Sequence, residues 1–120
     1  MVKIKFLFLL IIPIMTISCE NDSSDMTSIN VSVTNIEVYT YFTGISGDEE
    51  GVGISKQAKH YDISEIVRDS TTQWAAIYKY KAQNNYIGED TVELELLTGS
   101  DGVGPSTNSE IIRIKFDITN

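Results

Sequence analysis

The stretch TVELEL at residues 91–96 alternates polar and apolar side chains, and IRIKFDI at residues 112–118 does the same with the phase reversed. Successive side chains of a β-strand point to opposite faces, so each stretch is typical of a half-buried strand. In an antiparallel pair, Glu93 and Glu95 are expected to face Arg113 and Lys115, and such opposite charges stabilise neighbouring strands. These two stretches predict a sheet with one apolar and one charged face.

Shorter stretches of alternation extend this prediction toward the N-terminus. Strands are expected at 29–33, 36–43, 51–56 and 72–81. Residues 61–69 are ambiguous: Ile63, Ile66 and Val67 follow helical spacing, and Asp62 with Glu65 suits a capping box. We expect one short helical turn near 62–69 rather than a strand. The sequence predicts an all-β, immunoglobulin-like antiparallel β-sandwich of about seven strands.

Composition narrows the function. The chain has 120 residues, nine Lys+Arg against seventeen Asp+Glu, and a formal net charge of -8. This negative charge disfavours nucleic acid as the main partner, because the protein and the nucleic acid would repel each other. One Cys and one His exclude an intrachain disulfide, a Cys-based zinc cluster and a multi-His site. We expect no cofactor.

A longer segment, YKAQNNYIGEDTVEL at residues 80–94, resembles the recurring segment of bacterial Ig-like repeat domains. The likeness covers residues 72–119, the C-terminal half of the chain. It assigns structural roles to three residues. Tyr86 is expected to pack its ring at a strand corner and bond its hydroxyl to backbone, Gly88 to adopt a backbone shape that a side chain would obstruct, and Asp90 to cap the turn with its carboxylate.

The N-terminal segment has the features of an export signal. Lys3 and Lys5 precede a nearly all-apolar run at 6–17, which is too short to span a bilayer as a helix. The sequence TISC at 16–19 resembles the lipobox of bacterial lipoproteins. That resemblance implies a signal peptide at 1–18, cleavage between Ser18 and Cys19, and fatty acyl chains such as palmitate on Cys19.

The residues after Cys19 are polar and acidic, so 19–28 is expected to be a flexible tether that precedes a domain at 29–120. The lipobox resemblance implies anchoring in the outer membrane through the acyl chains. Acidic residues directly after the cysteine also resemble signals that send lipoproteins to the cell surface. A plain solvated spacer on the periplasmic side is the alternative.

Candidate site residues are few. Asp48, Glu49 and Glu50 beside glycines offer hard oxygen ligands for Ca²⁺, but three consecutive acids cannot all reach one ion from an extended chain, so a solvated loop is preferred. Tyr39 and Tyr41 are candidates for an exposed ligand-binding surface. We expect no metal and no catalytic residue.

A second alternation, His60, Asp62 and Ser64, contains the residue types of a hydrolase triad, but neighbours along one strand seldom reach one another. The expected function is therefore a lipid-anchored envelope protein with a non-catalytic binding or structural module, whose partner is another envelope protein or a glycan. The alternative is an accessory or ligand-binding subunit of an outer-membrane uptake complex.

Overall fold

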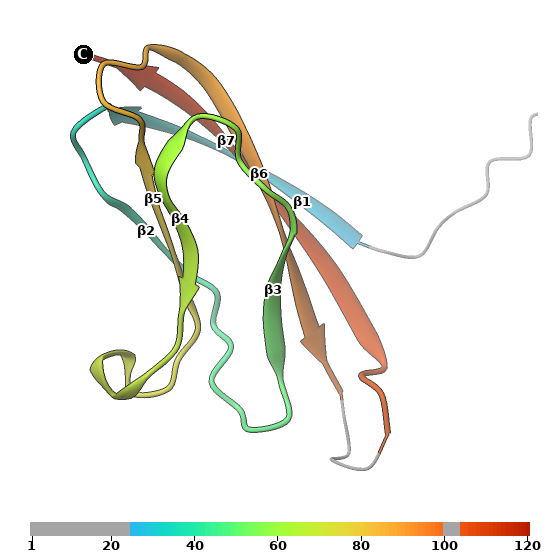
Figure 1. The fold of residues 1–120 in the computed structure, drawn as a ribbon. Helices are drawn as coiled ribbons and strands as arrows, with labels where there is room; N and C mark the ends of the chain where they lie inside the picture. The colour runs from blue at the N-terminus through green and yellow to red at the C-terminus, as the bar shows by residue number, and fades with distance from the viewer. Residues whose placement is uncertain (1–24, 100–103) are drawn as a thin grey trace, which may run out of the picture.

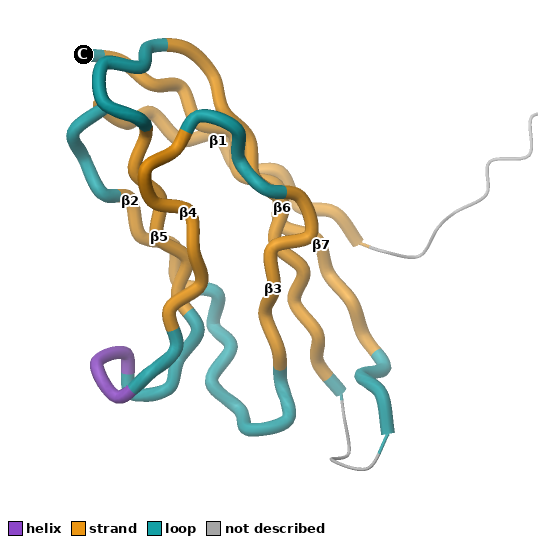
Figure 2. The backbone as a smooth tube through the Cα atoms, viewed as in Figure 1, coloured by secondary structure: helices purple, strands orange, loops and turns teal. Residues whose placement is uncertain are grey.

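The computed structural model describes residues 25–99 and 104–120, and within them the chain forms an all-β sandwich (Figures 1 and 2). The predicted signal peptide and the cysteine lie outside the described residues. A short 3₁₀ helix, Ser70–Thr72, joins β4 to β5. The strands are β1 (Asp25–Thr34), β2 (Tyr39–Phe42), β3 (Gly51–Lys56), β4 (Tyr61–Val67), β5 (Ile77–Ala82), β6 (Gly88–Thr98) and β7 (Asn108–Thr119).

The strands form two sheets that face each other. One sheet has the order β1-β7-β6-β3 and the other has the order β2-β5-β4. Four of the five strand pairings are antiparallel, as expected, and the fifth, between β1 and β7, is parallel. The chain passes from one sheet to the other at the β1–β2, β2–β3, β3–β4 and β5–β6 connections.

The core lies between the sheets and is filled by alternate residues of β5, β6 and β7, the strands that have a neighbour on both sides. The ring of Tyr80 in one sheet stacks on Phe116 in the other, with centroids 3.9 Å apart and an angle of 8°. Tyr39 meets the edge of the same Phe116 ring at 5.5 Å. The alternation read from the sequence is confirmed by the buried side chains Tyr78, Tyr80, Ala82, Val92, Leu94, Leu96, Ile112, Ile114, Phe116 and Ile118.

The strand register gives one of the expected charge pairs. Glu93 lies opposite Arg113, whose guanidinium donates two hydrogen bonds to Glu93 Oε1 at 2.9 and 2.7 Å. Lys115 lies instead opposite Thr91, and Glu95 lies opposite Ile111. The outer face of this sheet therefore keeps Lys115 without an acidic neighbour directly across the strand.

The helical turn expected near 62–69 is wrong, because Tyr61–Val67 is a strand. A register irregularity between Tyr61 and Ile63 interrupts the two-residue period, so the inward positions are Tyr61, Ser64 and Ile66. Of the three apolar residues with helical spacing only Ile66 packs on the core, while Ile63 and Val67 lie at the alternate positions of the strand. The helical turn comes later. Its capping residue is Asp69, which accepts the Thr71 N–H at 2.8 Å.

Two strand limits also differ from the sequence pattern. The strand β1 begins at Asp25 rather than at residue 29, because Asp25 already pairs with Glu110, so residues 25–28 of the expected tether belong to this strand. The strand β5 begins at Ile77 rather than at residue 72. Trp74 precedes it with a φ of 63° and is 61% exposed, so this side chain is not part of the buried stripe.

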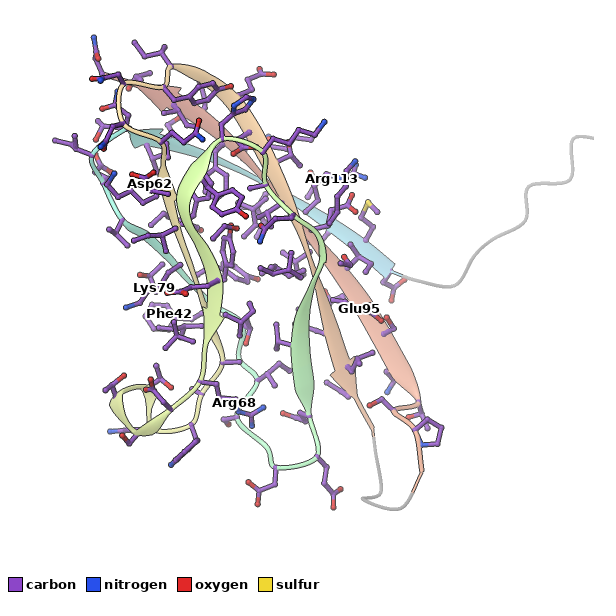
Figure 3. The ribbon with its side chains drawn as sticks, viewed as in Figure 1. Phe42, Asp62, Arg68, Lys79, Glu95 and Arg113 are labelled. Carbon is purple, nitrogen blue, oxygen red and sulfur yellow. The ribbon has the colours of Figure 1, made fainter. Side chains whose placement is uncertain are left out.

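The second strand does not expose Tyr39 and Tyr41, as a ligand-binding surface on these residues would require. Phe42 is 74% exposed (Figure 3) and Ile36 is 78% exposed, whereas Tyr39 and Tyr41 pack against the core. Only 39–42 forms a strand, and Ile36 lies in the preceding turn. A four-residue edge strand needs only two inward side chains, and the larger amphipathic tyrosines occupy those positions.

Substitution of Gly88 tests the corner between β5 and β6. Gly88 has a φ of 142°, and a Cβ there would lie 3.0 Å from Tyr86 Oη. We expect Gly88→Ala to lower the free energy of unfolding by about 1–3 kcal/mol, measured by urea denaturation.

Gly53→Ala is the matched control. Gly53 lies in β3, where its φ is not positive and an added Cβ would meet no other atom within 4 Å. Equal effects of the two substitutions would contradict the conformational account.

Candidate functional site

A buried carboxylate, Asp90 in β6, organises the end of the sandwich where β3 stops. Asp90 is 5% exposed. Its Oδ1 accepts the Lys59 and Thr91 N–H groups, and its Oδ2 accepts the His60 N–H, each at 2.9 Å. The Tyr80 hydroxyl donates to Oδ2 at 2.8 Å. Asp90 therefore lies inside β6, binds the N–H of the next residue, and also holds the β3–β4 connection, which the sequence did not indicate.

The two inward tyrosines of β5 are both neutral anchors of this region. Burial raises the pKa of Tyr80, and its hydrogen bond to Asp90 raises it further. Burial also raises the pKa of Tyr78, whose hydroxyl lies 2.7 Å from Ser64 Oγ. A neutral phenol that donates to a buried carboxylate satisfies both groups without adding charge to the core.

The β3–β4 connection is also held from the other sheet. Ser64 Oγ donates to Gln57 Oε1 at 2.6 Å, and Gln57 Nε2 donates back to the Ser64 carbonyl at 3.2 Å. Among residues 25–99 and 104–120, every buried side-chain polar atom has a hydrogen-bond partner. Residues 57–60 are thereby fixed to β6 through Asp90 and to β4 through Ser64.

Tyr86 and His60 close the end of this region. The His60 ring stacks on the Tyr86 ring with centroids 4.2 Å apart and an angle of 9°. Tyr86 Oη donates to the Glu89 carbonyl at 2.7 Å, a backbone group three residues ahead, in a solvent-exposed bond. Gly88 lies beneath this hydroxyl. The stacked rings fix the His60 imidazole beside Asp90.

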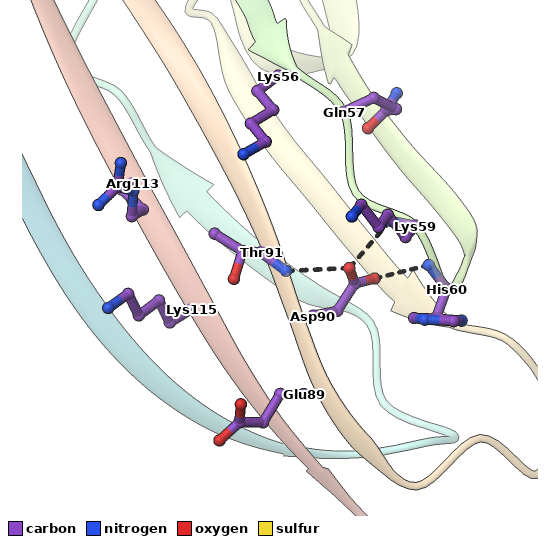
Figure 4. A pocket seen from close by; sticks show the side chains of 9 residues that line it. All are labelled: Lys56, Gln57, Lys59, His60, Glu89, Asp90, Thr91, Arg113 and Lys115. Carbon is purple, nitrogen blue, oxygen red and sulfur yellow. Dashed lines mark hydrogen bonds between the residues drawn. The ribbon is translucent and has the colours of Figure 1, made fainter.

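A hollow of about 390 Å³ opens beside this network on the outer face of the four-stranded sheet. Figure 4 shows cationic side chains on its two sides, with Thr91 between them. The hollow exists because β3 ends at Lys56, opposite Glu93, after which the chain leaves for the other sheet. The lining residues are Lys56, Gln57, Lys59, His60, Glu89, Asp90, Thr91, Arg113 and Lys115.

A second hollow of about 460 Å³ adjoins the first. The two share Glu89, Asp90, Thr91 and Lys115, and the second continues over β7 to Asn30 and Ser32 of β1. We call the two together the transverse groove, because it crosses β6, β7 and β1 rather than following one strand. No sequence motif marks it, since its residues come from four separate segments.

The other sequence candidates are placed elsewhere. Glu50 Oε2 accepts the Gly47 N–H at 3.2 Å, and Arg68 donates to the carbonyls of Gly47 and Glu50, so the loop with Asp48 and Glu49 is held by backbone contacts. The described residues contain no group of three or more His, Cys, Asp or Glu side chains suited to a metal ion.

The remaining candidates do not form an exposed aromatic surface or a triad. Tyr39 and Tyr41 point toward the core, and burial raises the pKa of both. The Ser64 hydroxyl bonds to Tyr78 and Gln57, while the His60 ring stacks on Tyr86. Ser18 and Cys19 lie outside the described residues.

The fold places this chain among small two-sheet β-sandwich proteins. No protein-family model and no curated protein matches its sequence. Among solved structures it is similar to an endo-fucoidan hydrolase from glycoside hydrolase family 107, at 15% identity and a TM-score of 0.47, covering 80% of this chain and 13% of that one. A cysteine protease inhibitor from Entamoeba histolytica is similar at 8% identity and a TM-score of 0.40, covering 79% and 94%. We draw no functional conclusion from likenesses of this degree.

Removal of the Asp90 carboxylate tests its role in stability. Asp90→Ala leaves three backbone N–H groups and the Tyr80 hydroxyl without their acceptor. We expect a loss of about 3–4 kcal/mol in the free energy of unfolding. Glu89→Ala, at the exposed neighbouring position, is expected to stay within about 0.5 kcal/mol. A similar small change in both variants would show that Asp90 is not an organising group.

Alkaline titration tests the buried phenols. The pKa of Tyr78 and of Tyr80 is raised in the folded state, so the unfolded chain ionises these groups first, near pH ~10. Their contribution to stability is complete below that pH and is lost as the pH rises toward the folded-state pKa. Ultraviolet absorbance should show fewer tyrosinates at about pH 11 in buffer than in urea. Titration of all six tyrosines at one midpoint in the folded protein would contradict this assignment.

Proposed function

We propose that this chain is a lipid-anchored protein of the outer membrane, carrying acyl chains on Cys19, and that its β-sandwich is an Ig-like, non-catalytic binding or structural module. The observation that carries the proposal is the position of the only cysteine of the chain. It follows Ser18 directly at the end of an apolar run, and a polar, acidic run comes after it. Two or three acyl chains would hold the protein at a bilayer almost irreversibly.

The beginning of the first strand supports this proposal geometrically. Asp25 is six residues beyond Cys19, and six extended residues span at most about 20 Å. The anchor would therefore keep the Asp25 end of β1 close to the lipid surface. The opposite end of β1, at Thr34, would lie farther from the membrane.

The attachment of β1 to the rest of the domain also suits an anchored module. Every residue of β1 from Asp25 to Thr34 has a partner on β7. A pull on the anchor would act along this strand and shear all of its hydrogen bonds together. The part of the chain that the structure describes holds no helix with the length and apolarity to cross a bilayer.

Several features favour a binding or structural role for the domain. His60, Ser64 and Asp90 are residue types that often act in catalysis. Here their side chains stack on another ring or form hydrogen bonds inside the fold. The transverse groove is a surface feature that these contacts leave open. In this proposal the partner of the anchored domain is another envelope protein or a glycan.

Metabolic labelling tests the anchor. In cells given a palmitate analogue, the wild-type chain is expected to be labelled and to sediment with the outer membrane, and Cys19→Ala is expected to lose both properties. Ser23→Ala is the matched control and should keep the label. Mass spectrometry should find a mature chain that begins at Cys19. Retention of Met1 with no acyl mass would contradict the proposal.

A further inference from the structure

The cationic residues of this acidic protein are concentrated in one place. The chain has nine Lys and Arg residues, two of which, Lys3 and Lys5, precede Cys19. Of the other seven, four line the first hollow of the transverse groove: Lys56, Lys59, Arg113 and Lys115. Local excess of one sign in a concave site attracts ligands of the other sign.

The charges inside the first hollow do not cancel. Arg113 is paired with Glu93, and the Asp90 carboxylate accepts four hydrogen bonds from the fold. Within residues 25–99 and 104–120, the ammonium groups of Lys56, Lys59 and Lys115 have no hydrogen bond or ion pair. Glu89 is the one carboxylate lining this hollow that is not already bonded within the described chain. Hydrogen bonds from these neutral donors do not cancel the charge of Asp90, so the lining of the first hollow has four cationic side chains against two acidic ones, Glu89 and Asp90. Three of the four cations have no partner among the described residues, and the hollow keeps an excess of positive charge.

The shape and lining of the groove indicate a polar, extended ligand. The first hollow is lined only by polar and charged residues. From Thr91 and Lys115 the groove continues over β7 to the Asn30 amide and the Ser32 hydroxyl. This second hollow is also lined by Val31, Phe116 and the acidic Asp117, so the excess of positive charge is confined to the first hollow. Protein partners usually dock on a central cluster of aromatic and aliphatic side chains, which the first hollow lacks among its described lining. Hydroxyl, amide and ammonium groups instead suit a chain of hydroxylated units with negative groups.

We propose that the transverse groove binds an acidic polysaccharide, with its oxyanion groups against Lys56, Lys59 and Lys115. The hydroxyl groups of the polysaccharide would form hydrogen bonds with the side chains of Thr91, Asn30 and Ser32. Charge-assisted bonds to carboxylate or sulfate supply the affinity. The negative charge on the rest of the domain does not prevent this, because physiological salt screens charges beyond about 8 Å. This inference rests on the binding role proposed above and is independent of the acyl anchor.

Binding is measured by isothermal titration calorimetry on the full chain in non-ionic detergent. The probes are oligogalacturonate for carboxylate, dextran sulfate for sulfate, and neutral dextran. We expect at least one acidic probe to bind, with affinity that falls as salt rises, and neutral dextran not to bind. Binding of one acidic probe alone identifies the oxyanion. Failure of both acidic probes, or equally tight binding of duplex DNA or polyglutamate, would overturn the proposal.

Single-charge variants locate the site. Lys115→Gln is expected to weaken binding about tenfold, the effect of one charge-assisted hydrogen bond. Lys79→Gln makes the same charge change on β5 of the other sheet, away from Arg113 (Figure 3), and should leave affinity unchanged. Equal weakening by both variants would show non-specific attraction and would overturn the site.

Removal of a negative charge from the first hollow is expected to strengthen binding of an acidic ligand. Glu89→Gln removes the acid that faces the three lysines, so affinity is expected to rise several-fold. Each variant is checked for an unchanged thermal midpoint, because all three positions are on the surface. Cys19→Ala, measured in the same way, is expected to bind as tightly as wild type. Because Cys19→Ala tests the acyl anchor and the calorimetry tests the groove, either proposal can fail while the other holds.

Discussion

The Asp90 carboxylate is the constraint on which the end of this sandwich depends. It lies between the sheets, where a charge is stable only when hydrogen bonds replace water. Three backbone N–H groups and the Tyr80 hydroxyl do so, and two of those N–H groups, from Lys59 and His60, belong to the segment that crosses from one sheet to the other. The same bonds therefore satisfy the buried charge and fix the crossing.

The transverse groove is a consequence of that crossing. Because β3 ends at Lys56 and the chain turns away to β4, the edge of β6 beside Thr91 has no neighbouring strand on that side. The held segment then places Lys59 beside Lys56, while the register of β7 places Lys115 opposite Thr91. The segment that the buried Asp90 carboxylate holds is thus the same segment that supplies Lys59 to the cationic hollow.

Much of the fold could be predicted from the sequence where one face of a strand is buried and the other is solvated. The strands that contain 92–96 and 112–118 have that regular pattern, and their inward residues are all buried. Prediction failed where the period breaks. The irregularity after Tyr61 breaks the two-residue period of β4, and apolar residues on both of its faces, Ile63 and Val67 against Ile66, gave helical spacing. The strand β2 is so short that its exposed Phe42 and inward tyrosines could not be assigned from four residues.

The candidate site was less predictable than the fold. The position of Asp90 relative to Tyr86 and Gly88 is local, so the sequence could single this residue out. Its bonds to Lys59 and His60 join residues about thirty positions apart, which no local pattern reveals. The sequence by itself determined the net charge and the alternation of the long strands, because these depend on composition and on neighbours along the chain. Only the tertiary structure decided which cations gather in one hollow, because strand register and the path between the sheets bring distant residues together.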